Sequence, residues 1–137
     1  MTTLAKLIKN ANFVYICGNG GSASTANHFA QDLVKIAGIK AISLCANEAI
    51  VMAYANDNGY ENIFSYQLSV FANKGDLLIT ISGSGTSLNI VHANNYADWK
   101  EIDRYAFPTM LELNCSMQEA ENEHLKLAHQ VTMELSR

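Results

Sequence analysis

The first residues that could bind a ligand or take part in catalysis follow a short apolar run, residues 13–17, near the start of the chain. Residues 18–22 read Gly-Asn-Gly-Gly-Ser, a glycine-rich turn that leads into a predicted helix. Such a turn lets backbone N–H groups approach an anion, and the N-terminus of the helix adds the positive end of its dipole. The residues that we therefore expect to bind a phosphate group are Asn19, Gly20, Gly21 and Ser22.

Two side chains that can move protons or bind a metal lie on the same predicted helix. His28 and Asp32 are four residues apart, which places them on one face of the helix, one turn from each other. A histidine on a helix is more often a packed or surface residue than a ligand, but the neighbouring glycine-rich turn favours a role in a site. A phosphate cradle followed by such a pair indicates a phosphosugar site.

A second loop has the same character. Ser82, Ser84 and Ser87 follow a continuous apolar run at 77–81, and Asn89 begins another predicted helix. Hydroxyl groups and helix-terminal N–H groups bind phosphate oxygens without a counter-charge. A loop of this composition is usually only a turn, but ligands of open α/β sheets bind beyond the carboxyl ends of the strands, where both loops would lie. The two loops together therefore predict one phosphate site.

Strands and helices must alternate to hold these loops side by side. Hydrophobic periodicity and turn residues predict helices over 3–9, 22–36, 48–55, 63–71, 89–97 and 118–135, and strands over 13–17, 41–44, 76–81 and 110–113, with 98–110 unassigned. This order is typical of a parallel sheet covered by helices on both faces. We expect an α/β fold, a three-layer α/β/α sandwich with a mainly parallel sheet, formed by a single domain over residues 1–137.

Composition excludes several classes of function. The net charge is −4 and no basic patch stands out, which argues against nucleic acid as a partner. No apolar run has the length of a membrane span, and no signal-peptide pattern is present. Three widely spaced cysteines suggest reduced thiols in the cytoplasm. Hydrophobic residues at 49% against 16% charged residues favour a homo-oligomer.

Four motifs, in this order, resemble the sugar isomerase (SIS) domain family, and its phosphoheptose isomerase branch in particular. The glycine-rich turn with His28 resembles the first signature of that branch, and Asn-Asp-x-Gly-Tyr-Glu at 56–61 resembles the middle one. Residues 81–89 resemble its phosphate loop, and the pattern Glu-x-x-His-x4-His at 121–129 resembles its C-terminal helix signature. The resemblance covers nearly the whole chain.

The resemblance implies an aldose–ketose isomerase that interconverts sedoheptulose 7-phosphate and glycero-manno-heptose 7-phosphate, on the way to lipopolysaccharide. This chemistry needs a base that moves a proton between C1 and C2 through an enediol, and an acid for the oxygens. We expect Asp32 to be the base, His129 the acid, and Asp57 to help orient the substrate. The expected ligands for zinc or another divalent metal are His28, Asp32, Glu121 and His129. A homotetramer is also implied.

The chain departs from this branch at several positions. Asp32 stands where the family has Glu, so its carboxylate lies about 1.5 Å further from the same target, and a misplacement of that size costs about 100-fold in rate. Glu121 stands where Gln is common, and its distance of about 12 Å along a helix from His129 makes joint ligation demanding. Gly83 and Thr86 stand where Thr and Asn are more frequent.

The family's long N-terminal helix is nearly absent, and no counterpart is evident for the strand and glycine-containing loop expected after Tyr96. The domain is therefore predicted to be compact or truncated relative to the family. A second function remains open beside the isomerase. In it, the chain is a non-catalytic SIS module that binds a phosphosugar or another protein, as one relative binds the replication initiator.

Overall fold

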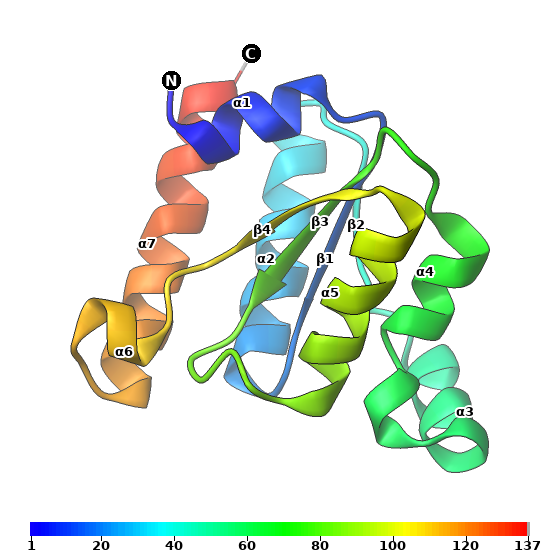
Figure 1. Ribbon diagram of the computed structural model, residues 1–137. Helices are drawn as coiled ribbons and strands as arrows, with labels where there is room; N and C mark the ends of the chain where they lie inside the picture. The colour runs from blue at the N-terminus through cyan, green and yellow to red at the C-terminus, as the bar shows by residue number, and fades with distance from the viewer. Residues whose placement is uncertain (137) are drawn as a thin grey trace.

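Four parallel strands form the centre of the computed structural model, which describes residues 1–136. The strands are β1 (Val14–Gly18), β2 (Ala41–Ser43), β3 (Leu77–Ile81) and β4 (Asp103–Ala106), and their order across the sheet is β2-β1-β3-β4 (Figure 1). Every residue of β1 and β3 is buried, as expected for central strands covered on both faces. These two strands carry the two predicted loops at their carboxyl ends.

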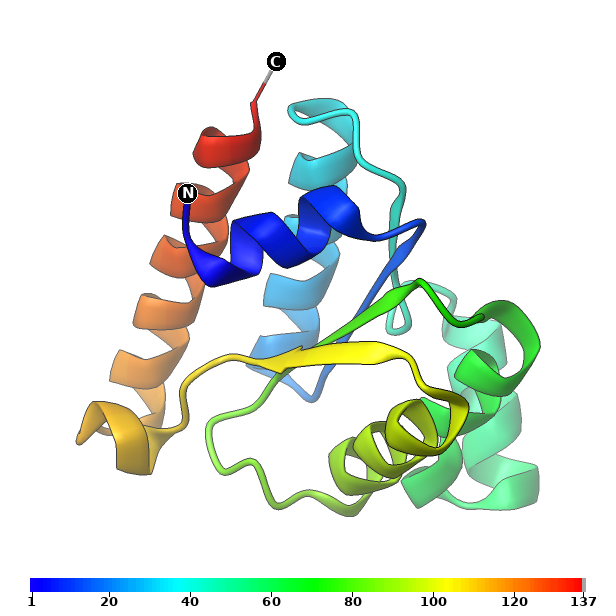
Figure 2. The same ribbon diagram turned by 45° about the horizontal axis from the view of Figure 1, so that its top comes forward.

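Helices cover both faces of the sheet. On one face lie α1 (Thr3–Asn10), α2 (Gly21–Lys35) and α7 (Met117–Leu135), and on the other lie α3 (Glu48–Asn58), the short 3₁₀ helix η1 (Tyr60–Asn62), α4 (Ser65–Phe71) and α5 (Leu88–Lys100) (Figure 2). Two hydrophobic clusters result, one on each side of the sheet. The predicted three-layer sandwich is confirmed.

Successive side chains of β1 point to opposite faces, which is how one strand serves both clusters. Val14 and Ile16 belong to the cluster under α2 and α7, whereas Tyr15 and Cys17 belong to the cluster under α4 and α5. Phe29 of α2 is fully buried in the first cluster, with its ring centroid 5.9 Å from that of Phe107. This packing fixes α2, and with it the face that carries His28.

Helices α2 and α7 lie side by side and run in the same direction, as both views show. The start of α1 is tied to the end of α7, because the Thr2 hydroxyl and backbone N–H donate to the Glu134 carboxylate over 2.7 and 3.0 Å. These two hydrogen bonds hold the pKa of Glu134 below its ordinary value. The first and last helices are thus joined beside α2.

Three sequence predictions are corrected by the structure. Met110–Leu113, predicted as a strand, is the short helix α6, because Thr109 and Glu112 form a reciprocal capping box at its start. The unassigned segment 98–110 contains β4, so a strand does follow Tyr96. The third helix continues to Asn58 and ends only at Gly59, whose φ of 96° no helix accommodates.

Within residues 1–136, no helix combines the length and the apolar character that crossing a membrane requires.

Candidate active site

A pocket of about 290 Å³ lies at the carboxyl ends of β1 and β3, where the two predicted loops meet. It is lined by Asn19, Gly20, Gly21, Ser22, Ile81, Ser82, Gly83, Ser84, Ser87, Met117 and Glu121. Seven of the eight residues predicted to bind phosphate are in this set. The eighth, Asn89, is buried beneath the pocket and pairs its amide with that of Asn19 over two hydrogen bonds of 2.9 Å.

The serine hydroxyls of the second loop accept local backbone hydrogen bonds and keep their own donors. Ser82 Oγ accepts from the backbone N–H of Gly85 at 2.9 Å, and Ser84 Oγ accepts from that of Thr86 at 3.2 Å. Ser87 precedes α5 but makes no capping hydrogen bond with its side chain. A hydroxyl that already accepts a backbone hydrogen bond still has its O–H to donate. These hydroxyls can therefore donate to the oxygens of an anion.

Positive partial charge in the pocket comes from the N-termini of helices rather than from basic side chains. None of the lining residues is Lys, Arg or His, and Glu121 is the one charged side chain among them. Helices α2 and α5 both begin here, and their N-termini supply unpaired N–H groups and the positive ends of two dipoles. This arrangement suits a phosphate group.

Two glycines of the first loop suit their positions for different reasons, one of backbone conformation and one of space. Gly20 has a φ of +56°, a conformation that glycine adopts without strain. Gly21 begins α2 with its Cα against the carboxylate of Glu121, so that any Cβ at this position would overlap Glu121. A larger residue at position 21 would therefore force the Glu121 carboxylate to move.

Further along the same two helices, three side chains converge. His28 Nε2 lies 3.1 Å from Asp32 Oδ2 and 3.0 Å from His129 Nε2, and His129 Nε2 lies 4.0 Å from the same Asp32 oxygen. Asp32 is only 7% exposed, and its Oδ1 accepts from Gln31 Nε2 at 2.9 Å. Both histidines are exposed, so a substrate can reach their rings. We call His28, Asp32 and His129 the His–Asp–His cluster.

This cluster fits a metal ion. The three ligand atoms all lie within 4.8 Å of one another. Nitrogen and oxygen ligands about 2.0–2.2 Å from a tetrahedral ion lie about 3.3 Å apart, which is close to the separations observed here. Two imidazoles and one carboxylate are also a donor set that zinc takes in sites that keep an open position for substrate.

The cysteines are poor candidates for ligands or nucleophiles. All three are free. Burial raises the pKa of the Cys17 thiol well above its usual value, with a smaller contribution from Cys45, and burial also raises the pKa of Cys45. Burial, followed by Glu119 and Glu123, raises the pKa of Cys115. Thiols that stay protonated neither attack nor bind metal readily.

Two of the residues predicted for metal binding or catalysis, Glu121 and Asp57, lie outside the His–Asp–His cluster. Glu121 lines the phosphate pocket instead, two helical turns before His129, because the rise of α7 over eight residues is about 12 Å. Asp57 lies exposed near the end of α3, where its carboxylate accepts from Asn56 Nδ2 at 2.9 Å. Within one chain, the structure brings Asp57 neither to the cluster nor to the lining of the phosphate pocket.

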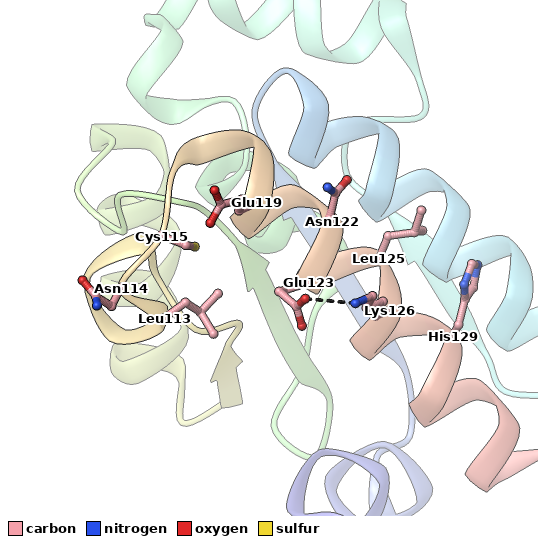
Figure 3. A pocket seen from close by; sticks show the side chains of 9 residues that line it. All are labelled: Leu113, Asn114, Cys115, Glu119, Asn122, Glu123, Leu125, Lys126 and His129. Carbon is pink, nitrogen blue, oxygen red and sulfur yellow. Dashed lines mark hydrogen bonds and ion pairs between the residues drawn. The ribbon is translucent and has the colours of Figure 1, made fainter.

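A wider hollow of about 640 Å³ lies on the outer side of α6 and α7 (Figure 3). His129 stands at one end of it and Cys115 and Asn114 at the other, with the ion pair between Glu123 and Lys126 in the middle. The hollow therefore leaves one side of the His129 ring open to the surroundings.

A family model described as the SIS domain matches residues 1–107. The chain belongs to the SIS domain family. Both glycine- and serine-rich loops and the first part of the cluster lie inside the matched range of this SIS domain, whereas α7 follows it.

Within the SIS domain family, the similarity is to phosphoheptose isomerases. One from Aliarcobacter butzleri (strain RM4018) is 43% identical over 91 residues, which are 63% of this chain and 48% of the relative. The chain thus spans about half the length of the curated relatives it matches.

Solved structures of two phosphoheptose isomerases resemble this chain in fold. A phosphoheptose isomerase from Neisseria gonorrhoeae gives a TM-score of 0.87 at 24% identity, covering 97% of this chain and 83% of that one, and so shares the fold. Another, from Francisella tularensis, gives 0.84 at 26% identity, covering 96% and 82%. These likenesses extend through α7 and therefore include the region that carries His129.

Proposed function

We propose that this SIS domain is a phosphoheptose isomerase that interconverts sedoheptulose 7-phosphate and glycero-manno-heptose 7-phosphate. The observation that carries the proposal is the placement of a phosphate pocket and a His–Asp–His cluster on the same pair of parallel helices. One feature would anchor the phosphate and the other would act on the carbonyl end of the sugar. The names of the relatives in this branch support the same activity.

The spacing of the two features favours a long sugar. Seven residues separate Gly21 from His28, a rise of about 10.5 Å along α2. In an extended open-chain heptose 7-phosphate, the carbonyl carbon of the ketose lies about 9–10 Å from the phosphorus, from ordinary single-bond lengths. A pentose phosphate is about 2.5 Å shorter. The helix rise therefore matches a seven-carbon substrate better than a five-carbon one.

The cluster offers the two groups that isomerisation needs. The Asp32 carboxylate would take the proton from one carbon and return it to the other, since its Oδ2 faces the side of α2 that His28 and His129 share. His129, exposed and 4.0 Å from that oxygen, would serve the substrate oxygens as acid. Phosphate held in the pocket would supply binding energy remote from the reacting carbons.

His28, Asp32 and His129 would also hold a zinc ion or another divalent metal in this site. When bound, such an ion would polarise the carbonyl of the sugar in place of the His129 proton, because Nε2 cannot bind a metal and donate a proton at the same time. Glu121, which lines the pocket between the two loops, would face the substrate near its phosphate end rather than complete this ligand set.

Turnover is the direct test of the proposed function. We expect the purified chain, treated with a chelator and then supplied with zinc, to convert sedoheptulose 7-phosphate into the aldose, and to do so more slowly without added metal. The conversion can be followed by separating the two sugar phosphates chromatographically. Calorimetry with the same sugar phosphate reports binding independently of turnover.

The alternative function is a phosphosugar-binding or protein-binding SIS module without catalysis. Retention of the complete His–Asp–His cluster favours the enzyme over this alternative. Binding of sedoheptulose 7-phosphate without turnover, with and without zinc, would establish the binding module and reject the isomerase.

A homotetramer is part of the proposal. Large apolar side chains are exposed on the outer helices and on the edge strand, including Val70 at 68% and Ile42 at 40%. We expect light scattering at micromolar concentration to give about 60 kDa, four times the chain mass of 15.0 kDa. A monomer would reject the tetramer but leave the cluster intact, because His129 meets His28 of its own chain.

We place the enzyme in the cytoplasm, on the way to the heptose of lipopolysaccharide. Three free cysteines support this location, since thiols stay reduced there.

A further inference from the structure

Tyr60 reaches the phosphate pocket from outside its lining. Its hydroxyl donates to Asn19 Oδ1 at 3.1 Å, across the gap between η1 and the first loop. The side chain of Asn19 lines the phosphate pocket, and it also lines a smaller pocket of about 140 Å³ on the other side of the loop, which Tyr60 borders. The Asn19 amide thus stands between the two pockets, with Tyr60 behind it.

The hydrogen bonds around Asn19 leave one N–H of its side-chain amide without a partner. Its Oδ1 accepts from Tyr60 and from Asn89 Nδ2, which uses both lone pairs of that oxygen. Its Nδ2 donates one hydrogen to Asn89 Oδ1 at 2.9 Å. One N–H of the amide remains, on a side chain that lines the phosphate pocket. Asn19 therefore presents a donor to the ligand, and no acceptor.

The short helix η1, which carries Tyr60, is linked to α5, the helix that follows the second loop. Asn62, at the other end of η1, has its Oδ1 3.1 Å from His92 Nδ1 of α5 and accepts from it in the tautomer that carries the proton on Nδ1. Asn89 lies in the first turn of the same helix, two residues after Ser87. Helix α5 thus fixes both partners of the Asn19 carbonyl oxygen relative to the phosphate loop.

We propose that Tyr60 is a positioning residue, which holds the Asn19 amide so that its remaining N–H points to an oxygen of the bound sugar phosphate. The inference rests on the proposed function only for the identity of that ligand. Tyr60 acts through Asn19 and does not touch the reacting carbons. Because its side chain is 58% exposed, removal of the hydroxyl leaves the core unchanged.

The test is Tyr60→Phe, with sedoheptulose 7-phosphate and inorganic phosphate as calorimetric ligands. We expect two- to tenfold weaker binding of both, the effect of one hydrogen bond. The kcat for the sugar phosphate should stay within about twofold while KM rises. The melting temperature should change by less than about 2 °C. Tyr66→Phe is the matched control, since Tyr66 is also partly exposed and packs edge-on against Tyr54.

A double-mutant cycle identifies the route of the effect. In an Asn19→Ala background, Tyr60→Phe should change affinity by less than about 1.5-fold, because the group that it positions is gone. In a Ser84→Ala background, its full effect should persist, since Ser84 shares no hydrogen bond with this network. Wild-type affinity in Tyr60→Phe, or an equal loss in both backgrounds, would overturn the proposal.

The outcomes separate this inference from the proposed function. Phosphate binding that depends on Tyr60, in a protein that does not isomerise the sugar, would support the positioning role and reject the isomerase. Turnover with a wild-type KM in Tyr60→Phe would support the isomerase and reject the positioning role.

Discussion

Replacing Asp32 by asparagine is expected to lower the rate of sedoheptulose 7-phosphate isomerisation by about 10²–10⁴-fold. The amide has nearly the same shape but accepts no proton from carbon, and it removes the negative charge between His28 and His129. The phosphate pocket lies about 10 Å away along the two helices, so affinity for the sugar phosphate should stay within about twofold. Turnover and calorimetric affinity, measured on the same preparation, give the two values.

Asp103→Asn is the matched control, because Asp103 is exposed on the edge strand β4 and belongs neither to the cluster nor to the pocket lining. It should keep wild-type activity. Asp32→Glu tests the length of the side chain, and we expect it to raise the rate if the short carboxylate limits the natural chain. An Asp32→Asn enzyme that keeps more than a tenth of the wild-type rate would exclude Asp32 as the base.

Replacing Phe29 by alanine is expected to lower the free energy of unfolding by about 3–5 kcal/mol. Phe29 is fully buried between α2 and the sheet, and its ring packs against Phe107. Truncation removes apolar contacts and leaves a cavity that the surrounding strands only partly fill. Since domains are stable by only about 5–15 kcal/mol, this change should be conspicuous in a urea titration monitored by circular dichroism.

Phe71→Ala serves as the control for Phe29→Ala, because Phe71 is 45% exposed at the end of α4. Its cost should be less than about 1 kcal/mol. If Phe29→Ala costs no more than Phe71→Ala, then α2 is not held to the sheet by this side chain.

The pocket at the carboxyl ends of β1 and β3 was predictable because its signals are local. A glycine-rich turn after a buried strand, and serines after another, are patterns that sequence displays directly, and parallel strands bring their carboxyl ends together. The network behind the pocket was not predictable in this way. Tyr60 and Asn19 are 41 residues apart, and the motif that contains Tyr60 gave no sign that its hydroxyl reaches the first loop.

The edge of the sheet shows where sequence patterns fail. Strand β4 begins with Asp103 and Arg104, both exposed, so it lacks the apolar run that marked β3. Residues 110–113 are mostly apolar and suggested a strand, whereas Thr109 and Glu112 cap a helical turn. That Thr-x-x-Glu spacing was visible in the sequence and is a recognised start signal of helices.

The His–Asp–His cluster depends on tertiary packing. His28 and Asp32 follow from helical spacing alone, but His129 joins them only because α7 lies parallel to α2 with its start against Gly21. No periodicity in α7 specifies its direction relative to α2. The same packing explains why Glu121 lies at the phosphate pocket rather than among the expected metal ligands.

His28 and His129 are 101 residues apart in the sequence, so the ribosome makes one long before the other. A growing chain carries both loops once residue 87 has been synthesised, whereas His129 emerges only with α7. Contacts between such distant residues close a long loop and form after local ones. The groups that would react are therefore assembled after the loops that would hold phosphate. An unfinished chain could begin to build the proposed anchor for phosphate before it has any means of the proposed catalysis.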